Sequence, residues 1–145
     1  MSSRAQSRKL TSAATAMSAR YLLDTNTIVA LLKLQSDVLR RITQAQESLI
    51  PSIVLGELYH GAHKSAQTTQ NLARTDAIAQ NNKILPCDTD TASIYGAIKA
   101  NLEAQGRRIP DNDMWIAALA RQHKLTLLTR DAHFDRIAPL DVEQW

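Results

Sequence analysis

Short apolar runs alternate with longer segments of helical periodicity along this chain, and this alternation constrains the fold more than any other feature. Four runs lie at residues 21–23, 48–50, 83–85 and 125–128, and a fifth short strand is expected at residues 140–142. The segments between them carry apolar residues at intervals of three and four, as amphipathic helices do. Strands separated by helices pair in parallel, so the pattern predicts an α/β fold. We expect one domain, a three-layer α/β/α sandwich around a short parallel sheet.

Polar residues mark the ends of several expected helices. Asp88 and Asp90 stand where one helix begins and are assigned to capping it, because short acidic side chains satisfy the free N–H groups of a helix start. Gly106 ends the same helix, since glycine readily adopts the left-handed conformation that closes a helix. The expected helices cover residues 25–34, 38–47, 66–82, 88–106 and 111–123, and a further one opens at Pro51.

Two aspartates follow apolar runs directly. Asp24 closes the run at residues 21–23, and Asp131 closes the segment at residues 125–130. Ligands bind at the carboxyl edge of an open parallel sheet, so acids that emerge there can meet although they are distant in sequence. For an isolated Asp24, the simpler interpretation is that it caps the helix that starts at Thr25.

Two more acids open the segment of residues 109–120, where a proline precedes apolar residues at helical spacing. One of Asp111 and Asp113 can serve as an N-cap, but a second acid two residues away cannot cap the same end in the same way. If the remaining acid joins those at the strand ends, the carboxylates repel one another, and a divalent cation relieves the conflict. Such a cluster is a hard-oxygen site for Mg²⁺ or Mn²⁺.

Glu57 stands among apolar residues of a predicted helix, where burial of an unpaired charge would be costly. Taken by itself, it is expected to point to solvent. His60 and His63 share the same helix at a spacing of three, which suits a chelated transition metal, but zinc sites usually show three or four ligands. We therefore expect these two histidines at the surface or in dimer packing.

The charge of the chain is unevenly distributed. Seventeen basic and fourteen acidic residues give a net charge of +3, yet residues 1–20 contain four basic residues and no acidic one. The remainder carries thirteen basic and fourteen acidic residues, so it has no net positive charge that would attract polyanions in general. If it handles nucleic acid, contact must come through metal ions and a local basic rim, such as Arg107 and Arg108 just before Asp111.

Residues 1–19 are rich in serine, alanine and threonine and lack periodicity, so we expect a disordered basic extension ahead of a domain at residues 20–145. Met17 offers an alternative start, and the composition weakly resembles an organelle transit peptide. The single cysteine, Cys87, cannot form an internal disulfide and fits a reducing cytoplasm. No apolar run approaches the roughly 20 residues of a membrane span.

Four blocks of the sequence together resemble PIN-domain ribonucleases, especially the VapC-type toxins of bacterial toxin–antitoxin pairs. The blocks read YLLDTNTIVALL, PSIVLGELYHGA, IPDNDMWIAALA and LTLLTRDAHFDRI, and they follow in the family's order across residues 20–145. The resemblance implies that the catalytic, metal-binding acids are Asp24, Glu57, Asp113 and Asp131. It places Asn26 and Thr129 as supporting polar residues beside the first and last acids, and it leaves Asp111 as the cap.

The function implied by this resemblance is a Mg²⁺- or Mn²⁺-dependent endoribonuclease that hydrolyses phosphodiester bonds with metal-activated water. The residue types agree, since carboxylates hold ions and the chain shows no nucleophile elbow, Gly-rich phosphate loop or dinucleotide fingerprint. The resemblance further implies a toxin that acts on RNA, is held inactive by a cognate antitoxin protein and is commonly a homodimer. We expect no association with a membrane.

Two other classes of protein also place acids at strand ends. A Mg²⁺-dependent phospho-acceptor or phosphatase-like domain needs an acid pair beside the phosphoaspartate and a lysine near the last strand, and the segments DTN and LLTRD supply neither. A PIN-like binding module that has lost catalysis is disfavoured by the presence of all four acids.

Overall fold

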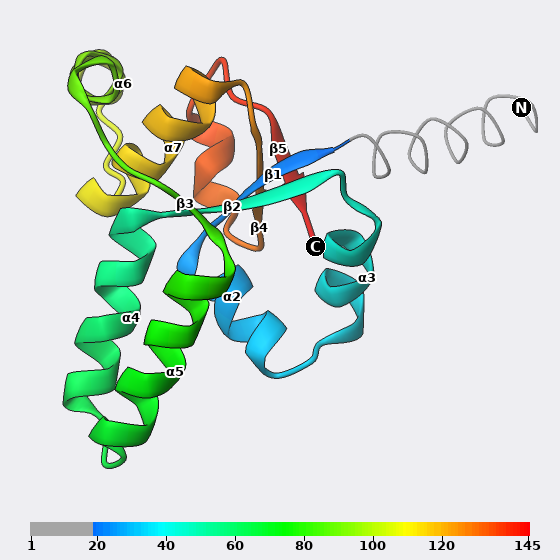
Figure 1. Cartoon of the computed structure of the whole chain (residues 1–145). Coiled ribbons are helices and arrows are strands. Elements are labelled where there is room, and N and C mark those ends of the chain that lie inside the picture. The colour runs from blue at the N-terminus through cyan, green and yellow to red at the C-terminus, as the bar shows by residue number, and fades with distance from the viewer. Residues whose placement is uncertain (1–18) are drawn as a thin grey trace, which may run out of the picture.

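Five parallel strands form the sheet in this computed structural model, which describes residues 19–145 (Figure 1). The strands are β1 (Arg20–Leu23), β2 (Glu47–Pro51), β3 (Lys83–Leu85), β4 (Thr126–Thr129) and β5 (Val142–Gln144). Their order in the sheet is β3-β2-β1-β4-β5, and every neighbouring pair is parallel. The predicted α/β class is confirmed.

Helices cover both faces of this sheet, which confirms the three-layer sandwich. The helices are α2 (Thr25–Leu32), α3 (Ser36–Gln44), α4 (Ser52–Lys64), α5 (Thr68–Asn81), α6 (Thr89–Ala104), α7 (Asp111–His123) and the 3₁₀ helix η1 (Ala132–Arg136). Figure 1 shows α2 to α5 on one side of the sheet and α6, α7 and η1 on the other. Within these layers, α4 packs along α5, and α6 packs along α7.

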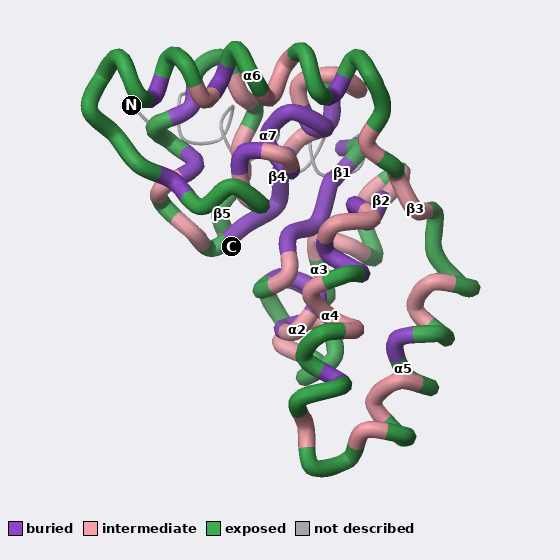
Figure 2. Tube along the Cα trace, turned by 90° about the vertical axis from the view of Figure 1, so that its left-hand side faces the viewer, coloured by how far each residue is buried: buried purple, intermediate pink, exposed green. Residues whose placement is uncertain are grey.

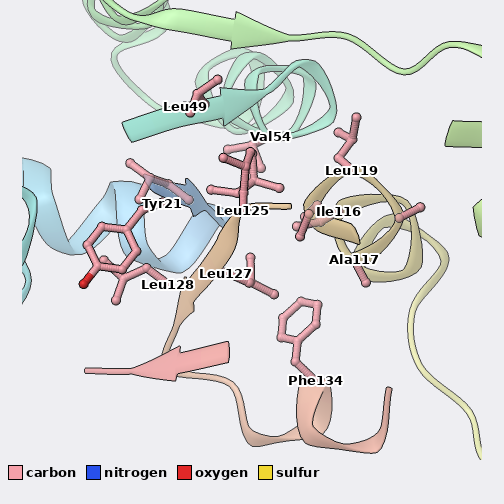
Figure 3. Close-up of a cluster of buried hydrophobic side chains, with 14 of the residues drawn as sticks. Tyr21, Leu49, Val54, Ile116, Ala117, Leu119, Leu125, Leu127, Leu128 and Phe134 are labelled. Carbon is pink, nitrogen blue, oxygen red and sulfur yellow. The ribbon is translucent and has the colours of Figure 1, made fainter. Parts of the chain in front are cut away.

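The core is centred on β1 and β4. Tyr21, Leu22, Leu127 and Leu128 are fully buried in these strands, and Phe134 is fully buried below them in η1 (Figure 3). Figure 2 shows burial concentrated in the central strands and α7, whereas α5 and α6 expose much of their surface. Because both faces of the central strands are covered, their sequences read as continuous apolar runs instead of alternating patterns.

The direction in which strands are added reverses between β1 and β4. From β1 the chain passes through α2 and α3 to β2 on one side, and from β3 it returns through α6 and α7 to β4 on the other. Such a reversal creates a crevice at the carboxyl ends of the two strands, where ligands bind in doubly wound sheets. Asp24 directly follows β1, and Asp131 follows β4 after one intervening residue. The fold therefore brings both strand-end acids to one crevice.

Several element boundaries differ from the predictions by a few residues, and one short helix was missed. The second helix ends at Gln44 and not near Glu47, because Glu47 already pairs with Arg20 as the first residue of β2. The last strand lies at Val142–Gln144 and not at residues 140–142. The helix η1 was not predicted, since a single 3₁₀ turn is too short to show a periodic pattern.

The ends of α6 follow the predicted capping with one exception. Asp88 is the N-cap: its carboxylate accepts the Thr91 N–H at 3.1 Å, and the Thr91 hydroxyl accepts the Asp88 N–H at 3.0 Å. The assignment of Asp90 to capping is wrong, because Asp88 fills that position and Asp90 lies within the first turn. Gly106 has φ +67°, the left-handed conformation expected of it.

The predicted disordered basic extension at residues 1–19 lies outside the described residues except for Ala19, as do the alternative start and the transit-peptide resemblance. Ala19 is buried, and its carbonyl accepts the N–H groups of Gln46 and Glu47 at the start of β2. None of the helices within residues 19–145 has the length and apolar character needed to traverse a bilayer.

Candidate active site

Asp24 ends β1 and caps α2. Its Oδ1 accepts both the backbone N–H of Thr27, at 2.9 Å, and the Thr27 hydroxyl, at 2.6 Å. Its Oδ2 accepts the hydroxyl of Thr129 at the end of β4. The side chain is only 4% exposed. Capping, the simpler interpretation of Asp24, is therefore confirmed for one oxygen, while the other oxygen joins the two central strands.

Thr129 connects Asp24 to Asp131. The Thr129 hydroxyl donates to Asp24 and accepts the backbone N–H of Asp131 at 3.0 Å. Asp131 in turn caps η1, because its Oδ1 accepts the N–H of His133 at 3.3 Å. Since Thr129 is fully buried, these bonds fix the exits of β1 and β4 relative to each other.

The two acids at the start of α7 lie in different surroundings. Asp113 is partly buried and lines a cavity at the strand ends. Asp111 is exposed, and its Oδ1 accepts the Tyr95 hydroxyl at 2.9 Å and the Lys99 ammonium at 3.3 Å. The assignment of Asp111 as the N-cap is wrong: Pro110 occupies that position, which places Asp111 inside the first turn. No side-chain hydrogen bond caps this helix.

Glu57 is partly buried at the mouth of the same cavity. Its Oε2 accepts the Thr25 hydroxyl at 2.7 Å, and its Oε1 accepts the side-chain amide of Asn112 at 3.3 Å. The expectation for Glu57 taken by itself, a side chain that simply points to solvent, is wrong because these two polar neighbours compensate for partial burial. Helix α4 thus delivers a carboxylate between the starts of α2 and α7.

All four predicted acids line one cavity of about 280 Å³. Asn26 also lines this cavity. Thr129 is not among the lining residues, but its hydroxyl donates a hydrogen bond to Asp24. The lining residues are Asp24, Thr25, Asn26, Glu57, Pro110, Asn112, Asp113 and Asp131. The carboxylates thus reach this cavity from four segments that are far apart in sequence.

His133 stands between two of the acids. Its Nε2 is 2.7 Å from Oδ2 of Asp113, and its Nδ1 is 2.7 Å from Oδ1 of Asp131. A neutral imidazole carries a single N–H, so the two contacts require either a protonated ring or a proton on one carboxyl group. In both cases the three groups together carry a net charge of −1. By contrast, His60 and His63 are exposed on α4, at the surface as expected.

The negative charge of the cavity is only partly offset by the protein. Burial is the main factor that raises the pKa of Asp113, and the charges of Asp131 and Glu57 raise it further, against the opposing effect of His133. An ionised Asp113 therefore costs free energy in the metal-free protein. A divalent cation removes that cost, and carboxylate oxygens are the ligands that Mg²⁺ and Mn²⁺ prefer. The donor set of the cavity fits such an ion.

A second groove meets the acidic cavity at Pro110, which lines both. Arg107 and Arg108 line this groove with exposed side chains, and Lys99 lies across from them on α6. The basic rim anticipated from the sequence therefore lies beside the acids in space as well as in the chain.

Some residues of the site were not identified from the sequence, namely Thr25, Thr27, Asn112 and His133. The two threonines follow Asp24 at a helix start, where hydroxyl groups commonly bond nearby side chains, so the segment DTNT did contain a signal. His133 also had a signal, because it stands two residues after Asp131 in a block already singled out. Asp131 caps the turn η1, and this turn brings the His133 ring back to the Asp131 carboxylate.

Comparison with known proteins agrees with this geometry. The family model of the PIN domain matches residues 21–140. Over 129 residues, which make up 87% of this chain and 98% of the relative, the chain is 36% identical to "Ribonuclease VapC2" of Haemophilus influenzae. With the same length and coverage, it is 33% identical to the "tRNA(fMet)-specific endonuclease VapC" of Shigella flexneri.

Solved structures show the same likeness. A chain in the DNA-bound VapBC complex from Salmonella typhimurium matches with a TM-score of 0.80 and 30% identity, over 88% of this chain and 98% of that one. A chain of VapBC-1 from nontypeable Haemophilus influenzae matches with a TM-score of 0.79 and 30% identity, over 86% and 97%. The fold and the matched residues show that the chain belongs to the PIN-domain family. Within that family, it is similar along nearly its whole described length to VapC ribonucleases.

Proposed function

We propose that this protein is a metal-dependent endoribonuclease, the toxin of a VapC-type toxin–antitoxin pair. The observation that carries the proposal is the convergence of four carboxylates in one cavity at the reversal point of the sheet. Ribonuclease and endonuclease names among relatives of matching length support it. We place the nuclease domain at residues 20–145 and a basic extension at residues 1–19.

The residues that hold the ion are Asp24, Glu57, Asp113 and Asp131. When bound, Mg²⁺ or Mn²⁺ lowers the pKa of a coordinated water and stabilises charge on the phosphate oxygens. No side-chain nucleophile is needed for this hydrolysis, which is consistent with a cavity lined by acids and amides.

The surrounding residues position these acids before substrate arrives. Thr129 donates a hydrogen bond to one oxygen of Asp24, and Asn112 donates one to an oxygen of Glu57 at the cavity mouth. Hydrogen bonds of this kind fix ligand orientation, and their loss typically weakens metal affinity or activity. Asn26 is exposed at the rim, where its amide can donate to a phosphate oxygen of the substrate.

The RNA strand crosses the basic groove as it leaves the cavity. Arg107, Arg108 and Lys99 line that groove, and guanidinium and ammonium groups bind backbone phosphates without reading sequence. Glu103 and Asp111 also line the groove, and Lys99 is paired with Asp111, so the positive charge offered to a polyanion beside the acids comes mainly from Arg107 and Arg108.

A cognate antitoxin silences the enzyme by placing a basic side chain among the four acids. An arginine fork satisfies two carboxylate oxygens at once and takes the place of an ion. An apolar groove between α2, α4 and α5 shares Thr25 and Glu57 with the acidic cavity and continues past Val29, Leu32 and Ile78. It suits an amphipathic segment that ends at the acids. Affinity for the antitoxin should fall as Mg²⁺ rises, and indifference to Mg²⁺ would contradict this arrangement.

We also expect the protein to act in the cytoplasm, because its single cysteine fits a reducing compartment, and to form a homodimer on the basis of family resemblance. The phospho-acceptor alternative gains no support, because no lysine is among the residues described as lining the acidic cavity. The alternative of a PIN-like binding module that has lost catalysis is tested by whether the purified protein cleaves RNA.

The direct test is cleavage of mixed cellular RNA by protein purified free of any partner, with Mg²⁺ or Mn²⁺ and with EDTA. Asp24→Asn, Glu57→Gln, Asp113→Asn and Asp131→Asn should each lower the rate roughly 10²-fold or more, as loss of one electrostatic contributor commonly does. Asp37→Asn, an exposed acid on α3, is the matched control and should cleave normally. Full cleavage in EDTA, or by Asp113→Asn, would overturn the assignment.

A further inference from the structure

His133 does not line the cavity itself, but it contacts two of the acids that do, and the proposed function leaves it unused. Its ring nitrogens contact two of the acids, at 2.7 Å each, and the ring is 21% exposed. Within residues 19–145, Asp113, Asp131 and His133 form the group whose ligand atoms, one from each residue, all lie within 4.8 Å of one another. An ion held by the two aspartates would therefore have an imidazole nitrogen within reach.

The backbone on both sides holds this ring in place. Asp131 accepts the N–H of His133 as the cap of η1, and the next residue, Phe134, is fully buried in the core. The His133 and Phe134 rings also contact each other, with centroids 4.9 Å apart at an angle of 43°. The imidazole is thus delivered to the acids by the fold, in contrast to the exposed His60 and His63 on α4.

We propose that His133 is a ligand of the catalytic ion, together with Asp113 and Asp131, and that it gives the site a preference for transition-metal ions over Mg²⁺. This inference rests on the proposed metal-dependent nuclease function. Imidazole nitrogen suits divalent transition ions, whereas Mg²⁺ favours an all-oxygen shell. A site with two carboxylates and one imidazole is therefore a mixed site, distinct from four acids alone.

The alternative role for His133 is that of an internal counter-ion, which the metal displaces. An ion that bound Oδ2 of Asp113 and Oδ1 of Asp131 would take up the oxygens that the ring now contacts. If the ring then moved away, a partly buried imidazole would lose both hydrogen-bond partners, which is unfavourable. Coordination through one nitrogen replaces a lost partner with only a small displacement of the ring. The geometry therefore favours the ligand role.

The test uses Mn²⁺ as a paramagnetic probe in the whole protein without RNA. Pulsed electron paramagnetic resonance should detect ¹⁴N coupling to bound Mn²⁺ in the wild type and in His63→Ala, the control histidine, and should lose it in His133→Ala. Calorimetry should show that His133→Ala lowers the preference for Co²⁺ over Mg²⁺ by about tenfold or more, the scale of effects around metal ligands. His133→Gln, which keeps a hydrogen-bonding side chain, should behave like His133→Ala.

Two results would overturn the inference. One is bound Mn²⁺ without nitrogen coupling in the wild type. The other is a rise in affinity for Co²⁺ and Mg²⁺ by the same factor in His133→Ala, as displacement of a counter-ion would give. Failure of the underlying function is distinguishable, because Asp113→Asn would then bind Mn²⁺ as tightly as the wild type. If Asp113→Asn loses the ion while the wild type shows no nitrogen coupling, only the role of His133 is wrong.

Discussion

Removal of the Asp24 carboxylate should destabilise the metal-free protein, whereas removal of the Asp113 carboxylate should not. Both acids line the same cavity, but they differ in what they hold. Asp24 is 4% exposed, caps α2 through Thr27 and accepts the buried hydroxyl of Thr129. For Asp113, burial raises the pKa, so its charge is a cost in the folded protein.

The expected magnitudes follow from these contacts. Asp24→Ala removes an N-cap, worth about 1 kcal/mol, and deprives the Thr129 hydroxyl of its acceptor, which costs about 1 to 3 kcal/mol. Thr27 keeps an acceptor in the Leu128 carbonyl at 2.8 Å, so no second hydroxyl is orphaned. The loss should total about 2 to 4 kcal/mol. For Asp113→Ala, relief of burial and repulsion opposes the lost His133 contact, and we expect a change within about 1 kcal/mol.

Urea unfolding in EDTA at neutral pH measures both effects, provided that the denaturant slope stays constant between variants. Asp37→Ala, an exposed acid on α3, controls for loss of one negative charge. Repulsion alone predicts that each acid of the cavity can be replaced without loss of stability, and the capping bonds make Asp24 the exception. Equal losses in Asp24→Ala and Asp113→Ala, or an Asp24→Ala that unfolds like the wild type, would refute this reasoning.

Five further outcomes are expected. Asp111→Ser should keep RNA cleavage and Mg²⁺ affinity, since Asp111 contacts α6 and not the cavity; a calorimetric loss comparable to that of Asp113→Asn would place Asp111 at the ion. Because burial raises the pKa of Asp113, Mg²⁺ affinity should fall on acidification at a higher pH than an ordinary aspartate would give, as a calorimetric pH series can show. By the same shift, metal-free stability should fall as the pH rises through that pKa, and unfolding of Asp113→Asn should lack this dependence. Arg107→Ala combined with Arg108→Ala should weaken RNA binding and reduce its salt slope by about 1 to 2, and an unchanged slope would place the RNA elsewhere. A chain that starts at Met17 should cleave short RNA normally, and loss of cleavage at low salt would make the extension part of the substrate contact.

The layered fold could be predicted from the sequence because several independent signals agree. Apolar runs such as residues 125–128 are continuous since both faces of the central strands are covered, and helical periodicity between the runs dictates parallel pairing. The position of the edge strand β5 was predicted too early in the sequence, because this strand is only partly buried and has no strong apolar pattern. Its register depends on pairing with β4, which the local sequence does not encode.

Of the acids that line the cavity, Asp24 and Asp131 could be predicted from their positions at strand ends, and Glu57 and Asp113 from the family resemblance, but their individual roles could not. Pro110 takes the cap position of α7, so both acids lie in the first turn, where positions two residues apart point about 200° apart around the helix. Asp111 therefore meets Tyr95 on α6, while Asp113 meets the cavity. The place of His133 depends on the turn that Asp131 caps, a tertiary feature without periodicity.

Hydrolysis by metal-activated water held by four acids determines the chemical ends of the cleaved RNA. Attack by water leaves linear phosphate and hydroxyl ends, whereas attack by the neighbouring 2′-hydroxyl with a side-chain base leaves a 2′,3′-cyclic phosphate. Mass spectrometry of a short RNA, cleaved with Mg²⁺ and challenged with EDTA, distinguishes the two. We expect linear ends only and no cleavage in EDTA. A cyclic phosphate formed in EDTA and lost in His133→Ala would contradict the account and identify a histidine-based ribonuclease.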